Sequence, residues 1–232
     1  MQKAVFILEG RGRFALTVNP MEAASTAPSR FEFAGVIERA AGAVLLAVAC
    51  PAIGISAAAI SLLSRRSPFI AHLRVGEGGR TFWMWKLRTM WPQGNPRSSG
   101  TGWVEYIIAE PSSDDKDPRD RRVSSAFARF LRRHSIDEIP QLWHVATGEM
   151  SIVGPRPMTR TELDKYYGAR AAEVLSVKPG VTGLWQTQGR NTIKFPERAA
   201  MDLELVNGLT ARSYISILLR TLPAVFHGKG AW

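Results

Sequence analysis

Two adjacent carboxylates, Asp137 and Glu138, lie in the stretch RRHSIDEIPQLWHVATGEMSIVGPRP, which runs from position 132 to 157. Arginines flank this acidic pair on both sides: Arg129, Arg132 and Arg133 before it, and Arg156 after it. Guanidinium forks bind phosphate oxygens well, and a carboxylate can act as a nucleophile or hold a cation. The pattern predicts phosphate chemistry with a nucleophile or a divalent cation at its centre.

A helix is expected to begin at the acidic pair, in one of two registers. Ser135 and Glu138 match a capping box, in which Glu138 would only satisfy the first backbone donors. Pro140 argues against that register; with Asp137 as the N-cap, Pro140 falls at N3, where no amide donor is required. Both registers leave the acids at a helix N-terminus, where phosphates bind well.

Two further stretches carry candidate ligand-binding side chains. Prolines on both sides of Arg156 fix its backbone, which reduces the entropy lost when the guanidinium binds an oxyanion. The glycine-punctuated stretch VTGLWQTQGRN is expected to be a loop, and its Gln186 and Arg190 suit contacts with a nucleotide or a sugar.

A β-hairpin that ends in two cations is expected upstream of the acidic pair. FIAHLRV and RTFWMWKLRTM flank the turn Gly-Glu-Gly-Gly at 76–79, and both have strand-like composition. Lys86 and Arg88 lie at the end of the second strand. The simpler interpretation is that both are ordinary solvent-exposed cations. No GK[ST] follows the glycines, so a nucleotide P-loop is not supported.

Residues 40–63 contain no charged side chain. A straight helix of that length would measure about 36 Å, enough to cross a hydrocarbon core of about 30 Å. A buried helix of a soluble protein is the alternative. Pro51 is expected to kink or break the helix, so a re-entrant hairpin competes with a single span.

Composition limits the class of protein. The 232 residues, 45% of them hydrophobic, allow one sizeable core, and the net charge of +10 favours polyanionic partners. The single cysteine, Cys50, excludes a disulfide framework and a cysteine zinc site. No nucleic-acid-binding module is recognised, so no nucleic-acid partner is expected.

From about residue 37 to 232 the sequence resembles the bacterial sugar transferases, also called monotopic phosphoglycosyl transferases. The resemblance rests on the apolar run with its proline, RVGEGGRTFWMWKLRTM, SIDEIPQL to VGPRP, KPGVTGLWQTQGRN, and the closing LLRT and HGKGAW. It implies an α+β, mainly helical fold: a small globular domain with a β-hairpin, anchored by an N-terminal proline-broken, re-entrant membrane helix. The expected divisions are a poorly ordered lead-in (1–30), the membrane hairpin helix (31–66) and a cytoplasmic catalytic domain with interfacial C-terminal helices (67–232).

The resemblance also implies an activity. Such proteins transfer a sugar 1-phosphate from a UDP-sugar to polyprenyl phosphate, using Mg²⁺, and so initiate exopolysaccharide or another surface glycan. Asp137 would be the nucleophile that forms an aspartyl-phosphosugar, Glu138 its partner, and the pair would hold Mg²⁺; which carboxylate ligates the metal stays open. The substrate-binding residues implied are Lys86, Arg88, Arg132, Arg156, Gln186 and Arg190.

The implied location is the cytoplasmic face of the bacterial inner membrane, with membrane lipids around the anchor. A homo-oligomer and contacts with downstream glycosyltransferases are compatible with the resemblance. An inactive membrane-tethered scaffold of a glycan-assembly complex is the alternative function. Intact Asp137, Glu138, Arg132 and Arg156 argue against it, because a scaffold does not need them.

Three departures from the family pattern stand out. Cys50 precedes Pro51 where a serine is common, and Ala126 begins a stretch where the family has Arg-x-Gly-Arg, so that one cation is missing or displaced to Arg122. Tyr214 stands where an aspartate is common. These departures bear on substrate identity and efficiency and leave the acidic pair intact.

Overall fold

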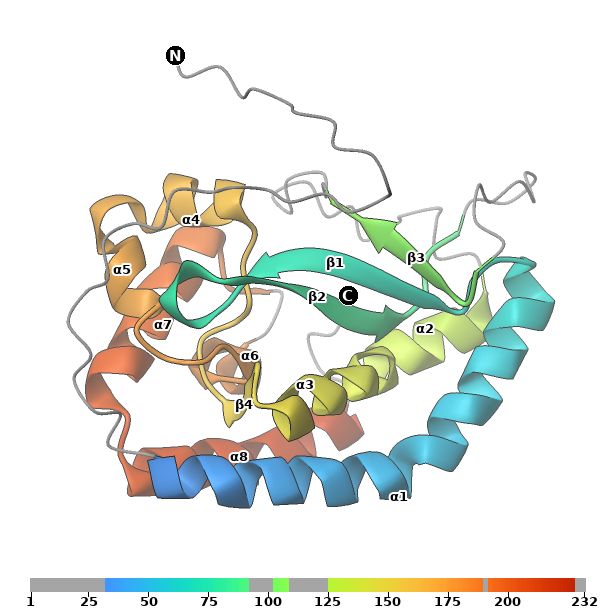
Figure 1. Ribbon diagram of the computed structural model, residues 1–232, viewed down its shortest axis with the longest axis horizontal. Coiled ribbons are helices and arrows are strands. Elements are labelled where there is room, and N and C mark those ends of the chain that lie inside the picture. Colours follow the sequence, from blue (N-terminus) through green and yellow to red (C-terminus); the bar gives the residue numbers. More distant parts are fainter. Residues whose placement is uncertain (1–31, 92–101, 109–124, 190–191, 228–232) are drawn as a thin grey trace, which may run out of the picture. The chain divides into compact units, whose positions relative to one another are not determined.

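The computed structural model describes residues 32–91, 102–108, 125–189 and 192–227, and side chains between 35 and 223 within those ranges. The chain divides into two units, Met1–Arg30 and Phe31–Trp232, and every described residue belongs to the second. The expected lead-in, residues 1–30, lies outside the described residues, as does Arg122. In the second unit the helices outweigh a small sheet, which confirms a mainly helical α+β fold (Figure 1).

Helix α1 (Glu32–Ser64) opens the described chain. Among the described residues, its segment Gly35–Ser64 is the one helical stretch long and apolar enough to cross a membrane, and only 17% of its most apolar window is buried. Exposed aliphatic side chains lie along it: Val36, Ile37, Val44, Leu45, Val48, Ile55, Leu62 and Leu63. Such a large uncovered apolar surface is typical of a helix that contacts lipid.

Pro51 lies inside α1 and does not end it, because helix continues to Ser64. Figure 1 shows the ribbon of α1 changing direction partway along its length. Proline removes one backbone donor and crowds the preceding turn, which is the usual origin of such a bend. The helix is therefore bent and uninterrupted, and two separate half-helices are not observed.

The other side of α1 packs on the globular part of the chain. Ile53, Ala57 and Ile60 share a hydrophobic cluster with Leu87 and Leu131. Nearer the start of α1, Gly42 lies so close to α3 that an added Cβ would be 2.8 Å from a methyl group of Val145. The anchor and the globular part thus share one core.

The predicted hairpin is confirmed. Strands β1 (Phe69–Val75) and β2 (Thr81–Leu87) pair antiparallel around the short 3₁₀ helix η1 (Glu77–Gly79). Gly78 and Gly79 have φ of 64° and 80°, a left-handed conformation that glycine adopts without steric cost.

A third strand, β3 (Val104–Ile107), pairs parallel with β1 and gives the sheet order β2-β1-β3. It lies between residues 91 and 120, a stretch whose Pro, Gly, Ser and Asp content is typical of a long loop. Its four residues contain Val, Tyr and Ile, which favour strands. The surrounding Pro, Gly, Ser and Asp residues obscured this short signal.

The remaining elements follow in chain order: α2 (Ala126–Arg133), η3 (Ile136–Gln141), α3 (Leu142–Thr147), β4 (Ser151–Val153), α4 (Arg160–Tyr166), η4 (Gly168–Arg170), α5 (Ala171–Val174), β5 (Gly180–Thr182), α6 (Leu184–Gln188), α7 (Phe195–Gly208) and α8 (Ala211–His227). Strands β4 and β5 form a separate parallel pair. The stretch VTGLWQTQGRN, expected to be a loop, therefore contributes a strand and a short helix.

Helix α8 is joined to α1 by a polar contact. Glu38 Oε1 accepts hydrogen bonds from the Tyr214 hydroxyl, from Ser151 Oγ at 2.6 Å and from the Ile152 amide at 3.0 Å. Tyr214, one of the departures from the family pattern, thus links the C-terminal helix to the membrane helix.

Candidate active site

The acidic pair lies in η3, and neither expected capping register occurs. Ser135 precedes η3 in the left-handed region (φ 55°) and makes no side-chain cap bond, while Asp137 and Pro140 lie inside the 3₁₀ helix. Ile136 and Ile139 are three residues apart, so in a 3₁₀ helix they lie on one side, and both pack against the cluster around Leu131. This packing turns the intervening acids away from the cluster.

Asp137 is almost fully buried, with 9% of its surface exposed. Burial, followed by the charge of Glu138, raises the pKa of its carboxyl from 3.8 to about 6. Lys86 and Arg132 oppose that rise because their positive charges favour the ionised form. Near neutral pH the group is therefore a mostly ionised, poorly solvated carboxylate, a suitable state for a nucleophile.

Glu138 is the point where three elements meet. Lys86 Nζ of β2 lies 2.9 Å from Glu138 Oε1, and Arg156 Nη1 lies 3.9 Å from the same oxygen. About a quarter of each of the Glu138 and Arg156 side chains is exposed, so solvent and ligands can reach them. Lys86 is thus part of the site, and the simpler reading of a solvent-exposed strand-end cation is wrong.

The turn that carries Arg156 is held from both sides. The Gly180 amide donates to the Pro155 carbonyl at 2.8 Å, and the Val75 amide donates to the Met158 carbonyl at 2.8 Å. A Cβ added to Gly154 would lie 2.6 Å from the Lys178 carbonyl, so only glycine fits there. Strand β5 and the end of β1 therefore fix the Arg156 backbone, in addition to the flanking prolines.

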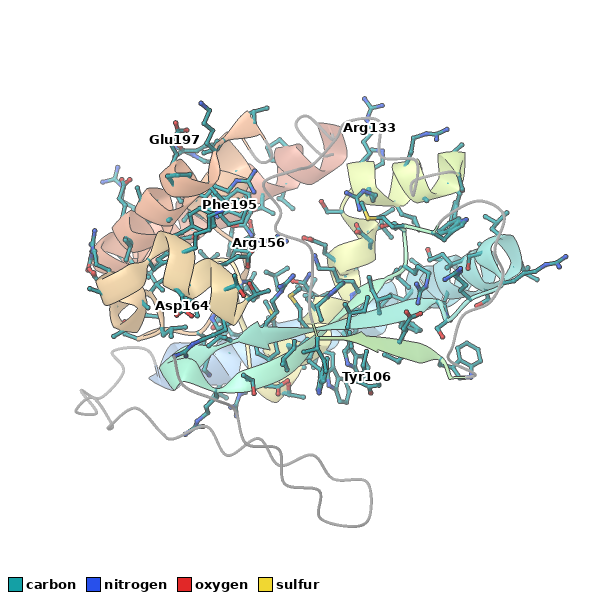
Figure 2. All side chains as sticks on the ribbon, turned by 90° about the horizontal axis from the view of Figure 1, so that it is seen from above. Tyr106, Arg133, Arg156, Asp164, Phe195 and Glu197 are labelled. Atoms are coloured by element: carbon teal, nitrogen blue, oxygen red, sulfur yellow. The ribbon has the colours of Figure 1, made fainter. Side chains whose placement is uncertain are left out.

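Arg132 reaches the site from the last turn of α2. The Ser125 hydroxyl caps this helix by accepting from the Ala128 amide at 3.2 Å. Arg132 acts on Asp137 through its charge. Arg133, by contrast, is exposed, and Figure 2 shows it pointing outward, away from Arg156.

The other residues expected to bind substrate are not brought to the acidic pair by any described contact. Arg88 is buried, with its Nε 2.7 Å from the Ser67 carbonyl and its Nη2 2.5 Å from Glu105 Oε2, so it ties β2 to β3. Gln186 lies in α6 and donates to the Val181 carbonyl at 3.4 Å. Arg190 lies outside the described residues. Binding roles for these three residues stay predictions.

The two carboxylates fit a Mg²⁺ ion of the kind that is shared with substrate. Within the described ranges, no three His, Cys, Asp or Glu side chains are grouped to hold a metal by themselves. Mg²⁺ usually takes only one or two carboxylates, with water and substrate phosphates completing its shell. Buried Asp137 beside Glu138 is a donor set of that kind.

Sequence reasoning missed a second group of polar residues behind Arg156. A small pocket is lined there by Asp202, Trp185, Tyr167, Phe195 and Arg198, among others. Asp202 is only 2% exposed, and burial raises the pKa of its carboxyl to about 7. The missed signal was an acid on the buried face of α7, one turn after Ala199 and next to Leu203.

Comparison with known proteins identifies the family of this chain. The model of the family described as bacterial sugar transferase matches residues 31–228, which include the acidic pair and all the elements around it. The chain belongs to the bacterial sugar transferase family. The resemblance noted in the sequence is thereby confirmed.

Several curated sugar transferases and related proteins are similar to this one. The exopolysaccharide production protein ExoY of Sinorhizobium fredii is 38% identical over 172 residues, covering 72% of this chain and 73% of the relative. The UDP-glucose:undecaprenyl-phosphate glucose-1-phosphate transferase of Caulobacter vibrioides is 34% identical over 205 residues, with 85% and 71% covered. The undecaprenyl-phosphate galactose phosphotransferase of Salmonella typhimurium is 36% identical over 69% of this chain, which matches only 34% of that longer protein.

Proposed function

We propose that this sugar transferase moves a sugar 1-phosphate from a UDP-sugar to undecaprenyl phosphate, through a covalent intermediate on Asp137, and so initiates a surface glycan. The names of the relatives from Caulobacter and Salmonella support the reaction type and the lipid acceptor. The ExoY relative supports a role in exopolysaccharide synthesis. The observation that carries the proposal is the buried Asp137 carboxylate beside Glu138, within the field of Lys86, Arg132 and Arg156.

The proposed chemistry consists of two displacements at one phosphorus atom. A carboxylate oxygen of Asp137 attacks the phosphorus that bears the sugar, and the bond to the UMP oxygen breaks, so UMP leaves with the electron pair. A phosphate oxygen of the lipid then attacks the same phosphorus, and the Asp137 carboxylate leaves. The products are UMP and a lipid diphosphate sugar, and the carboxylate is regenerated.

The cations around Asp137 fit the charge of this reaction. The donor diphosphate is negatively charged, and so is the buried Asp137 carboxylate. The two groups repel each other unless nearby positive charges compensate. Lys86 and Arg132 already favour the ionised Asp137, and Arg156 presents a guanidinium that can bind two phosphate oxygens. Their proposed role is to hold the diphosphate with the sugar-bearing phosphorus facing the nucleophile.

A divalent cation is part of the proposal. Asp137 and Glu138 would hold Mg²⁺ together with the donor phosphates. When bound, Mg²⁺ would neutralise charge on the diphosphate and on the departing UMP.

The membrane arrangement is proposed as well. The exposed apolar side chains of α1 and of α8, where Ile215, Leu219 and Leu222 recur on one face, suit contact with lipid. We propose that α1 enters and leaves the inner membrane on its cytoplasmic face, with the bend near its centre making the return. The lipid phosphate and the acidic pair would then meet at the membrane surface.

The experiment is an assay of UMP release by purified protein with Mg²⁺, undecaprenyl phosphate and a panel of UDP-sugars that includes UDP-galactose and UDP-glucose. We expect UMP release with at least one donor and its loss in Asp137→Asn, which keeps the side-chain volume but is not a nucleophile. Glu204→Gln on the exposed side of α7 is the matched control and should release UMP at the normal rate. Unchanged release by Asp137→Asn contradicts the proposal.

A further inference from the structure

Arg156 has the one backbone amide donor among residues 155–157, because the prolines on both sides of it have no N–H. That amide donates to the carboxylate of Asp202 in α7. Both residues line the small pocket that Phe195 also borders, and Figure 2 shows Arg156 and Phe195 next to each other. Helix α7 therefore holds the turn at the residue whose side chain reaches Glu138.

Asp202 joins three segments of the chain through one buried carboxylate. Besides the Arg156 amide, it accepts from the Tyr167 hydroxyl just after α4, at 2.9 Å, and from the indole N–H of Trp185 in α6. Burial raises the pKa of the Asp202 carboxyl, whereas the three donors and the Arg156 charge oppose that rise. A carboxylate accepts at both oxygens and can serve all three donors, whereas the amide of an asparagine would turn an NH₂ group toward one of them.

Trp185 carries the same restraint to the guanidinium of Arg156. The Arg156 Cζ lies 5.8 Å from the centroid of the Trp185 ring, and the Arg198 Cζ lies 4.6 Å from the same centroid. The indole is buried, and its N–H bond to Asp202 fixes the orientation of the ring. A cation over an aromatic face is attracted to it, more strongly where water is excluded. Arg156 is thus restrained at its backbone by Asp202 and at its guanidinium by the Trp185 ring.

The carboxylate of Asp202 stands among apolar neighbours. Ala199 and Leu203 of the same helix pack in the core around Leu163. A buried carboxylate is costly, and apolar side chains of similar size often stabilise a core more. Stability alone therefore does not account for an acid at this position. Its bonds lead to Arg156, and a side chain that is held in place loses less entropy when it binds an oxyanion.

We propose that Asp202 is a positioning residue for donor binding. It holds the Arg156 backbone directly and the Arg156 guanidinium through Trp185, so that the guanidinium is preorganised for the donor diphosphate. The inference rests on the proposed function for the identity of that diphosphate. In this role Asp202 does not touch the substrate and acts through Arg156.

The test is a double-mutant cycle measured by calorimetry, with the full chain in lipid nanodiscs, Mg²⁺ present and UDP as the probe. UDP has the diphosphate but no sugar 1-phosphate to transfer, so binding is measured without turnover. We expect Arg156→Gln to weaken UDP binding about tenfold or more, and Asp202→Asn about fivefold or more. The double variant should stay within about twofold of Arg156→Gln, because both changes remove the same contact.

Trp185→Phe gives a second cycle, since it keeps an aromatic ring and removes the indole N–H. It should weaken UDP binding about twofold or more and add nothing to Arg156→Gln. Lys86→Met on the hairpin is the contrasting partner: its loss should multiply with that of Asp202→Asn, because no described contact joins Lys86 to Asp202. Glu204→Gln on the exposed side of α7 is the matched control, and melting temperatures check that each variant is folded.

Two results overturn the inference. Unchanged UDP affinity in folded Asp202→Asn would show that Arg156 binds the diphosphate without this support. Losses that multiply between Asp202→Asn and Arg156→Gln would show that Asp202 acts by another route, such as a general loosening of the fold. If Asp202→Asn does not fold, the cycle with Trp185→Phe decides by the same two criteria.

The same samples separate this inference from the proposed function. A wild-type protein that binds UDP with this coupling but releases no UMP from any UDP-sugar would keep the positioning role and contradict the transferase reaction. A protein that releases UMP while the losses of Asp202→Asn and Arg156→Gln multiply would do the reverse.

Discussion

Lys86 Nζ lies 2.9 Å from Glu138 Oε1, although 52 positions separate the two residues in the chain. The contact joins the end of the β-hairpin to the acidic pair and places a positive charge beside both carboxylates. Both side chains are largely withdrawn from water, at 13% and 26% exposed, so the interaction is screened less than a surface ion pair. The hairpin therefore takes part in the electrostatics of the site.

Replacement of this lysine tests that role. We expect Lys86→Met to reduce the rate of UMP release at pH 7 at least tenfold, because the pKa of Asp137 rises further and a phosphate partner is lost. The acid limb of the pH–rate profile should also move to higher pH. Arg80→Met, on an exposed residue before the same strand, is the control. An unchanged profile in Lys86→Met would show that the hairpin cation does not act on Asp137.

The raised pKa of Asp137 gives the wild-type protein a specific pH dependence. Only the ionised carboxylate can attack phosphorus, and its pKa is about 6. Activity per free enzyme, measured as kcat/KM for the UDP-sugar, should therefore rise as the pH increases through about 6 and level off above about 7. Glu138→Gln should move the midpoint to lower pH, because the Glu138 charge raises the pKa of Asp137. A midpoint near 4 in the wild type would contradict the described burial.

Gly148 offers a test of the left-handed turn that ends α3 beside α1. It ends α3 with φ of +85°, and a Cβ added there would lie 2.1 Å from the Arg39 guanidinium of α1. We expect Gly148→Ala to lower the free energy of unfolding by about 1 kcal/mol or more, since alanine is strained in that conformation. Gly208→Ala, where nothing lies within 4 Å of the added Cβ, should be close to neutral. Thermal melts of both variants in the same detergent make the comparison.

The re-entrant arrangement that we propose for α1 predicts that its two ends lie on one side of the membrane. In a Cys50→Ser background, single cysteines are placed at Ser29 and at Arg80. Both should react with a membrane-impermeant maleimide only after the membrane is permeabilised, so that the reagent reaches the cytoplasmic face. Labelling of the two positions from opposite faces would replace the re-entrant helix with a spanning one.

The sequence predicted those parts of the fold that depend on local pattern. The hairpin at 69–87 carried strand-like runs around glycines, and the 24 uncharged residues from 40 to 63 could hardly be other than a long apolar helix. Helix α7 begins at Phe195, and the local pattern is consistent with that start because Pro196 suits the first turn of a helix. The acidic pair and Arg156 were identified from residue type alone, and the structure brings them together.

The parts that could not be predicted depend on contacts between distant segments. Strand β3 has only four residues and is ordered by pairing with β1. Ser135 adopts a left-handed conformation and makes no side-chain cap bond, while Ile136 and Ile139 pack against a cluster of distant residues, so neither capping register occurs. Tertiary packing buries Arg88 against Glu105 and Asp202 against Tyr167. The spacing of residues along the sequence does not predict such contacts.

The central claim is that Asp137 becomes covalently bonded to the sugar phosphate. The most direct measurement is the intact mass of the protein after incubation with Mg²⁺ and a UDP-sugar from which it releases UMP, in the absence of the lipid acceptor. We expect an added mass equal to one sugar phosphate, mapped to Asp137, absent from Asp137→Asn and removed when undecaprenyl phosphate is supplied. Turnover by wild-type protein that never carries this mass, or an adduct that survives in Asp137→Asn, would contradict it.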